Sequence, residues 1–151
     1  MTTLHKILQK HDQNKYATDN GTKTHAQLHK IVIAPDTETG DAVLIKKIKQ
    51  IPEHTFLFAP GTKTEVPIAG TVQGQFISRR IDRMYIDHTQ KHIAILDYKT
   101  DTDRKKFYSK YISQMQDYVN LLHAIYPDYT LDAYLLWTHD FLLEKLPIKP
   151  L

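Results

Sequence analysis

Cysteine is absent from the chain of 151 residues, and its absence excludes several classes of protein. Without thiols the chain has no disulfide scaffold, no cysteine-bound zinc, no iron–sulfur cluster and no thiol nucleophile. A chain without cysteine also fits a reducing compartment.

Long apolar stretches are absent as well. No segment approaches the roughly 20 apolar residues that are needed to span a membrane. The N-terminal sequence MTTLHKILQKHDQNKY is polar and lacks the apolar core of a signal peptide. We therefore expect a cytoplasmic protein that makes no use of a membrane.

The phosphate-binding motif Gly-x-x-x-x-Gly-Lys-Ser/Thr is a third absence. The stretch Gly61-Thr62-Lys63-Thr64 comes nearest but lacks the first glycine at the required spacing. An ATP-driven motor is therefore not expected in this chain.

The bulk composition is that of an ordinary soluble domain, with 41% apolar and 25% charged residues. Its length predicts one domain over residues 1–151. The net charge of +3 is compatible with a polyanionic partner, but it falls short of the basic stripe that would by itself indicate nucleic-acid binding.

Helical spacing of apolar residues recurs in the first part of the chain. It predicts a short helix within residues 3–10 and a second helix over residues 22–33 that ends before Pro35. Residues 36–50 fit either a helix or a strand.

Strand patterns dominate the middle of the chain. Residues 54–59 and 65–69 are short strand candidates, and residues 75–86 alternate with a period of two. A polar turn over residues 87–91 leads into the apolar run at residues 92–98, which we expect at the centre of a sheet.

After Asp103 the apolar residues step by three and four, which predicts a helix of about five turns that is ended by Pro127. Residues 131–137 form a further core strand, and residues 141–146 an edge strand. This order of elements predicts an α/β fold with a mixed sheet.

Asp82, Asp97 and Lys99 form the constellation that points to chemistry. Residues 82 and 97 are symmetric about the centre of the 87–91 turn, so a regular hairpin would place them opposite each other. Two opposed carboxylates repel, and a divalent cation between them relieves the repulsion. Lys99 follows on the same face of its strand as Asp97.

Structural alternatives exist for these residues. An ordinary salt bridge between Asp97 and Lys99, or between Asp82 and Arg80, would also explain the pattern. His25 and His29 have the spacing of zinc ligands, but the glutamate of the His-Glu-x-x-His motif is missing, and a solvated His29 is the simpler interpretation.

Two further groups have alternative interpretations. Tyr111 and Tyr118 suit base stacking or core packing equally, since both lie on the apolar stripe of the predicted helix. Lys105 and its basic neighbours could follow a phosphate backbone or form a solvated helix start.

Six short blocks stand in an order typical of one nuclease family. They are Gly21-Thr22-Lys23-Thr24-His25, Glu65-Val66-Pro67, Ile81-Asp82-Arg83, Ile95-Leu96-Asp97-Tyr98-Lys99-Thr100, Tyr111-Ile112-Ser113-Gln114-Met115-Gln116-Asp117-Tyr118 and Ala133-Tyr134-Leu135-Leu136-Trp137-Thr138. Together they resemble the PD-(D/E)XK nuclease domain of the RecB/AddA-type, exodeoxyribonuclease V-like enzymes. The resemblance spans residues 21–138, leaves residues 1–20 as an N-terminal extension, and implies a restriction-endonuclease-like mixed central sheet flanked by helices.

The resemblance implies a Mg²⁺ or Mn²⁺ site. Asp82 and Asp97 would bind the metal, with the main-chain carbonyl of Tyr98 and the ring of His25 as further ligands. Lys99 would position or activate the attacking water in metal-assisted hydrolysis of a phosphodiester.

Supporting roles follow from the same resemblance. Glu65 would support the first metal or a second one, and Gln114 and Tyr118 would reach back from their helix to the site and to the DNA backbone. The chain departs from the family at Ser78-Arg79-Arg80, where a glycine is usual. Arg79 and Arg80 could there grip phosphate.

With this resemblance, the sequence predicts a metal-dependent DNA nuclease for repair, recombination or degradation of DNA. We expect it either to work with a helicase or a recombination-complex subunit or, without a motor, to be limited to trimming DNA. The alternative is a non-catalytic DNA-binding or complex-assembly module derived from a helicase-nuclease. Action on RNA, or as a toxin or defence effector, stays open. So does the choice between exonuclease and endonuclease.

Overall fold

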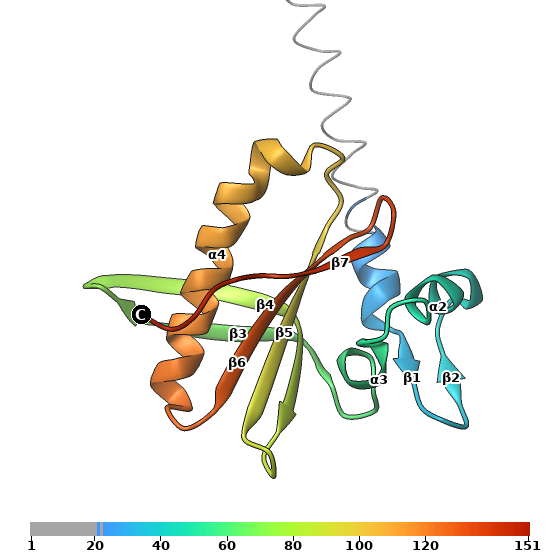
Figure 1. Ribbon diagram of the computed structural model, residues 1–151, viewed down its shortest axis with the longest axis horizontal. Coiled ribbons are helices and arrows are strands. Elements are labelled where there is room, and N and C mark those ends of the chain that lie inside the picture. The colour runs from blue at the N-terminus through green and yellow to red at the C-terminus, as the bar shows by residue number, and fades with distance from the viewer. Residues whose placement is uncertain (1–20, 22) are drawn as a thin grey trace, which may run out of the picture.

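The computed structural model describes residue 21 and residues 23–151 (Figure 1). The helix expected within residues 3–10 lies outside the described residues. Among the described helices, none combines the length and the apolar character needed to cross a membrane.

A five-stranded mixed sheet forms the centre of the molecule. Its strands lie in the order β3 (Lys63–Val72), β4 (Gln75–Asp87), β5 (His92–Lys99), β6 (Thr130–Trp137) and β7 (Leu142–Lys145). Strands β5 and β6 pair in parallel and the other neighbours antiparallel. The mixed sheet, and the central position of β5 within it, confirm the predictions for these strands.

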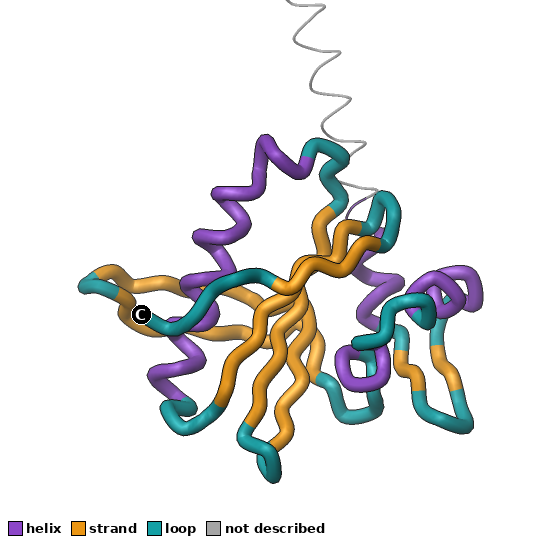
Figure 2. Tube along the Cα trace, in the orientation of Figure 1, coloured by secondary structure: helices purple, strands orange, loops and turns teal. Residues whose placement is uncertain are grey.

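The two faces of the sheet are covered by different parts of the chain (Figures 1 and 2). Helix α4 (Arg104–Ile125) packs on one face, where Ile93 and Ile95 of β5 contribute to the core. Residues 23–58 cover the other face, where Ala94 and Leu96 point. This alternation along β5 explains why its sequence is apolar without interruption.

The layer opposite α4 consists of short elements. They are the helical residues 23–29, which we call the first helix, and β1 (Val32–Ile33), β2 (Glu38–Thr39), α2 (Ala42–Ile48) and α3 (His54–Leu57). Among the described strands, β1 and β2 pair only with each other. Residues 36–50, whose sequence fitted either a helix or a strand, thus contain β2 and α2.

Two predictions for this layer are wrong. Residues 54–59, expected as a strand, contain α3, because Leu57 and Phe58 are both buried in the same cluster, and a strand would direct neighbouring side chains to opposite faces. The helix expected to reach Ile33 ends at residue 29, and Val32–Ile33 forms β1, since residues shortly before a proline favour extended backbone.

The hairpin of β3 and β4 extends beyond the end of β5, and we name residues 66–81 the arm. In Figure 1 it projects to the left, and α4 crosses it. The approach is close: a Cβ added to Gly70 would lie 2.8 Å from Cδ2 of Leu121 on α4. The ladder of β4 and β5 ends at Arg83↔Leu96, while β4 continues in the arm beside β3, and we call the place where β4 and β5 separate the gap.

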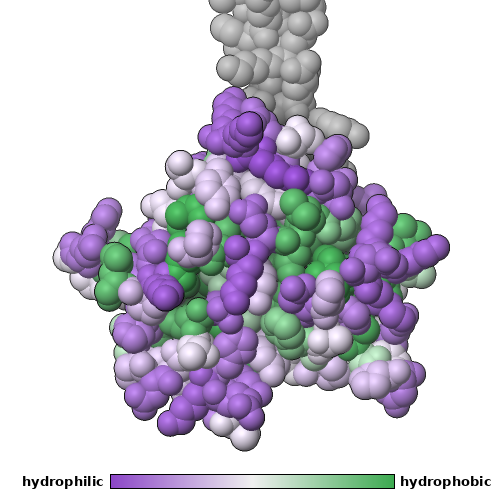
Figure 3. Space-filling model, in the orientation of Figure 1, coloured by the Kyte–Doolittle hydropathy of each residue, from purple (hydrophilic) through white to green (hydrophobic). Residues whose placement is uncertain are grey.

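On the face that Figure 3 displays, apolar residues (green) gather in patches that polar residues (purple) separate from one another. The side chain of Phe76, in the arm, is 69% exposed, and it is the one aromatic residue among the large hydrophobic residues that are exposed in the described part of the chain.

Arg83 of β4 is the buried residue that joins the two layers. Its side chain is 1% exposed, and its guanidinium donates hydrogen bonds to the carbonyls of Leu28 (3.0 Å) and Ile31 (2.9 Å) at the end of the first helix. It also donates to the hydroxyls of Thr62 (2.7 Å) and Tyr98 (3.0 Å). A cation near helix-terminal carbonyls interacts favourably with the helix dipole, so Arg83 fixes the first helix against the sheet.

We expect Arg83→Met to lower the free energy of unfolding by about 3 kcal/mol, because it leaves several buried carbonyl and hydroxyl groups without a donor. Urea denaturation of the two proteins measures the difference. Arg80→Met, on the same strand but exposed, is the matched control and should change the value by less than about 0.5 kcal/mol. Equal losses in both variants would contradict the role of Arg83.

Candidate functional site

Asp82 and Asp97 meet where β4 and β5 separate. The ladder runs from Asp87↔His92 to Arg83↔Leu96, which is the register that the hairpin symmetry predicts. The next pair in this register, Asp82 and Asp97, lies just beyond the last ladder pair. The two residues therefore lie where β4 and β5 separate.

The backbone around Asp82 departs from a regular strand. Ile81 is buried on the α4 side and Arg83 on the opposite side, although residues two apart normally share a face. Glu65, which would pair with Asp82 in the β3–β4 register, is missing from the ladder and has φ +50°. For a residue other than glycine this conformation is uncommon. The distortion turns Asp82 into the gap.

Hydrogen bonds hold the Asp82 carboxylate. Its Oδ2 accepts a bond from the backbone N–H of Tyr98 (2.9 Å) and lies 3.4 Å from Nε2 of His25. Burial disfavours the charged form, but the bonds from His25 and Tyr98 outweigh it and hold the pKa of Asp82 below its usual value. Asp82 is thus the ionised member of the carboxylate pair.

His25 donates from both ring nitrogens. Nδ1 lies 2.8 Å from the carbonyl oxygen of Gly21, and Nε2 lies 3.1 Å from the carbonyl oxygen of Tyr98. Only the imidazolium can donate from both nitrogens. The bond to Asp82, opposed by burial, raises the pKa of His25 to about 9.

Asp97 is the buried member of the pair, with 4% exposure. Burial raises its pKa to about 7, the neighbouring Lys99 opposes this shift, and the charge of Asp82 adds to it. The Lys99 ammonium lies 2.5 Å from Oδ2 of Asp97. The salt bridge between Asp97 and Lys99, which was one alternative interpretation of the sequence, is therefore present, but it is part of a larger cluster.

A chain of hydrogen bonds orients Lys99 from α4. The ammonium donates to Oε1 of Gln114 (2.9 Å), whose Nε2 donates to the hydroxyl of Tyr118 (3.0 Å). That hydroxyl in turn donates to the carbonyl of Arg80 (3.2 Å). Because Tyr118 donates its proton to a carbonyl, it accepts from the amide group of Gln114, and Gln114 must present its oxygen to Lys99.

Tyr111 holds Lys99 from another side. The ammonium lies 4.1 Å from the centre of the Tyr111 ring, within the range of a cation–π contact. The Tyr111 hydroxyl donates to Asp101, and burial followed by this carboxylate raises the pKa of the hydroxyl. Tyr111 thus packs against Lys99.

The other expected site residues lie further from this cluster. The Glu65 side chain is 57% exposed and has His29 as its nearest basic group, at 3.7 Å. Arg79 lines a groove together with Lys99, whereas Arg80 and Lys105 are not part of that groove. His29, interpreted above as solvated, has a side chain that is only 14% exposed, because it packs against Tyr98.

Two residues of the site escaped the sequence analysis. Asp101 anchors Tyr111, and Arg83 anchors the helix that carries His25. Arg83 could have been found from its place in the sequence, since it stands in a strand between the apolar residues Ile81 and Met84 and must be satisfied if buried. Nothing in the sequence distinguishes Asp101 from the other polar residues after β5.

The donor groups fit a small hard cation. Two carboxylates, the Tyr98 carbonyl and the His25 ring adjoin one another, although no group of three or more His, Asp or Glu side chains in the described part of the chain has the arrangement of a metal site. Mg²⁺ needs no such group, since it is commonly bound by one or two carboxylates and several waters. His25 could join only after losing its Nε2 proton.

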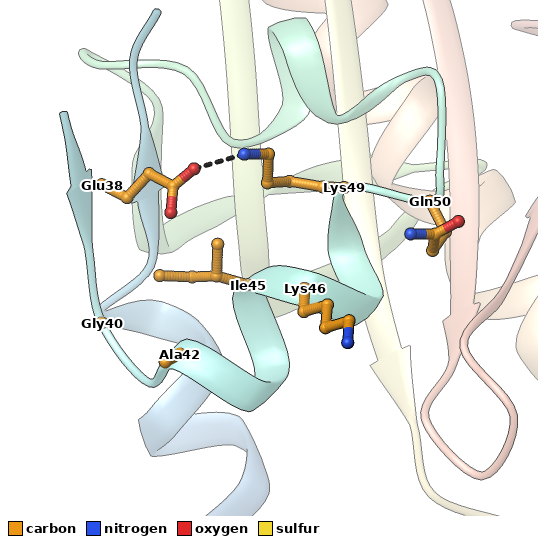
Figure 4. Close-up of a pocket in the computed structure, with 7 residues that line it drawn as sticks. All are labelled: Glu38, Gly40, Ala42, Ile45, Lys46, Lys49 and Gln50. Carbon is orange, nitrogen blue, oxygen red and sulfur yellow. Dashed lines mark hydrogen bonds and ion pairs between the residues drawn. The ribbon is translucent and has the colours of Figure 1, made fainter. Parts of the chain in front are cut away.

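A separate hollow lies between β2 and α2 (Figure 4). The ion pair of Glu38 and Lys49 (2.5 Å) crosses one side of it, and Ala42, Ile45, Lys46, Gln50 and Gly40 complete its lining. The charges of Glu38 and Lys49 neutralise each other, and none of the expected site residues contributes. We therefore assign no function to this hollow.

Comparison with known proteins adds no assignment, because no protein-family model and no curated protein sequence matches the chain.

We expect His25→Gln to destabilise the metal-free protein more at pH 6 than at pH 9.5. The pKa of His25 is raised on folding, so its stabilising effect is complete below the unfolded value near 6.5 and is lost as the pH rises through about 9. Urea denaturation in EDTA at both pH values measures it.

His139→Gln, at an exposed histidine, is the control for this experiment. A loss of stability from His25→Gln that is the same at pH 6 and pH 9.5 would contradict the bonding described for His25.

Proposed function

We propose that the chain is a metal-dependent nuclease of the PD-(D/E)XK type with a restriction-endonuclease-like fold. The observation that carries the proposal is the position of Lys99, whose ammonium contacts both the buried Asp97 and Gln114 beside a second carboxylate, Asp82. A simple surface ion pair needs no such supports, and the cluster supplies the groups that hydrolysis of a phosphodiester requires.

Mg²⁺ or Mn²⁺ bound at Asp82 and Asp97 would polarise the phosphodiester and lower the pKa of a bound water. Lys99 would hold the attacking water or stabilise the charge on the phosphate. Gln114 and Tyr111 would keep the ammonium in place, since both contact it. Burial of Asp97 by α4 excludes bulk water from that side of the pair.

DNA is the proposed substrate, and a helicase or recombination-complex subunit is the proposed partner. The mixed sheet with a helical layer on each face supports the restriction-endonuclease-like assignment, but many α/β proteins share these layers. The family assignment therefore depends on the six sequence blocks and on the cluster around Lys99.

The purified protein is expected to cleave DNA in the presence of Mn²⁺ and not in EDTA. Linear, circular, single-stranded and double-stranded DNA are tested in parallel. Asp97→Asn and Lys99→Met should each lower the cleavage rate by roughly 10²- to 10³-fold, because each removes a charged group from the reacting centre. His139→Gln should leave the rate unchanged.

Cleavage that persists at the same rate in Asp97→Asn would exclude this site as its source. If the unchanged protein binds DNA but cleaves none, and calorimetry detects no binding of millimolar Mn²⁺, the non-catalytic DNA-binding module is the correct function.

Tyr118→Phe tests the supporting chain. Without the hydroxyl, Gln114 loses the acceptor that fixes its orientation, and Lys99 is no longer held in one position. We expect a fall in cleavage rate of about 10-fold, smaller than for Lys99→Met because the ammonium is retained. Tyr126→Phe, at the end of α4 and outside this chain of bonds, is the control. Equal activity of the two tyrosine variants would refute the supporting role.

A further inference from the structure

A polar groove lies between α4 and the arm, beside the carboxylate pair. It has a volume of about 510 Å³, and its lining is drawn from α4, from the end of β5 and from the arm: Arg79, Lys99, Lys110, Tyr111, Ser113, Gln114 and Asp117. Lys99 thus belongs both to the cluster around Asp97 and to the wall of this groove.

The α4 residues of the groove form one stripe along the helix. Lys110 and Asp117 are seven residues apart, which corresponds to roughly 10 Å along the axis. Gln114 lies between them and contacts Lys99. The groove is therefore elongated along α4 and passes over the Lys99 ammonium.

Two of its cations are available to a ligand. Lys110 is exposed and makes no ion pair with any described residue. Within the described part of the chain, Arg79 donates to the carbonyl of its neighbour Ser78 (3.2 Å) and has no carboxylate partner. Asp117 is the one carboxylate in the lining. Arg79 and Lys110 thus line the groove together with Asp117, and the Lys99 ammonium, which is paired with Asp97, lies between them and the carboxylate pair.

We infer that this groove binds the phosphodiester backbone of a single nucleic-acid strand next to the bond that is cleaved, with Arg79 and Lys110 as its phosphate contacts. The inference rests on the proposed function and adds the form of the substrate to it. Arginine and lysine side chains are the usual phosphate contacts, and phosphate contacts fix the position of the strand without reading its sequence.

The shape of the groove favours a strand over a small anion or a duplex. A single strand rises about 3.4 Å per nucleotide, so the 10 Å between Lys110 and Asp117 corresponds to roughly three nucleotides. The volume is that of a pocket for a ligand of moderate size and would hold only part of one strand. Gln114 and Ser113 offer neutral hydrogen-bonding groups between the charges.

The test measures binding of fluorescein-labelled dT12 by fluorescence anisotropy in EDTA, where metal-dependent cleavage cannot occur. The double variant Arg79→Gln/Lys110→Gln should weaken binding on the order of tenfold. It should also make the plot of log association constant against log salt concentration less steep by about 1.4, because two phosphate contacts on a single strand are lost.

Lys30→Gln/Lys46→Gln is the matched control, because it removes two positive charges outside the groove. Lys30 is exposed and does not line the groove, and Lys46 lies on α2 at the hollow of Figure 4. Its salt slope should change by less than half as much. Urea denaturation confirms that both double variants are folded.

An equal loss of affinity and slope in the two double variants would overturn the inference, since it would mean a general effect of charge. A larger loss on a 12-base-pair duplex than on dT12 would overturn the assignment to a single strand. Because binding is measured without metal, a protein that fails to cleave DNA in Mn²⁺ but shows the groove-specific loss would refute the nuclease and keep the groove.

Discussion

The burial of Arg83 is the constraint on which the arrangement of the molecule depends. Its guanidinium is covered almost completely and has no carboxylate partner among the described residues, so carbonyl and hydroxyl groups must satisfy it. Two of these carbonyls, of Leu28 and Ile31, are supplied by the end of the first helix. The helix must therefore stop there and lie against β4. His25, one turn earlier, is carried to the Asp82 side of the gap by the same constraint.

The site itself is a compromise between charge and burial. Asp97 lies in a place where its charged form is disfavoured, and Lys99 compensates for only part of that cost. Asp82 avoids the same difficulty through bonds from His25 and from the Tyr98 backbone. The pKa of Asp82 is lowered, whereas the pKa of Asp97 is raised to about 7. An ordinary surface ion pair does not contain two carboxylates whose pKa values are moved apart in this way.

The sequence was sufficient for the elements with a strong period and for the register of the central hairpin. The alternation in β4 and the apolar run of β5 are decided locally, and their symmetry places Asp82 opposite Asp97. The first layer was harder, because its elements are short and their ends are set by tertiary contacts such as those of Arg83. The link from Asp101 to Tyr111 could not be predicted either, since it depends on how the loop after β5 meets α4.

The irregular backbone at Asp82 has a consequence for how the molecule responds as a whole. A regular sheet separates the side chains of its two faces, so that the layers packed on them vary almost independently. Here the carboxylate pair stands in an opening of the sheet and receives His25 from one layer and, through Lys99, Gln114 from the other. These few contacts couple the two layers, so that a substitution in one layer also alters the stability of the other.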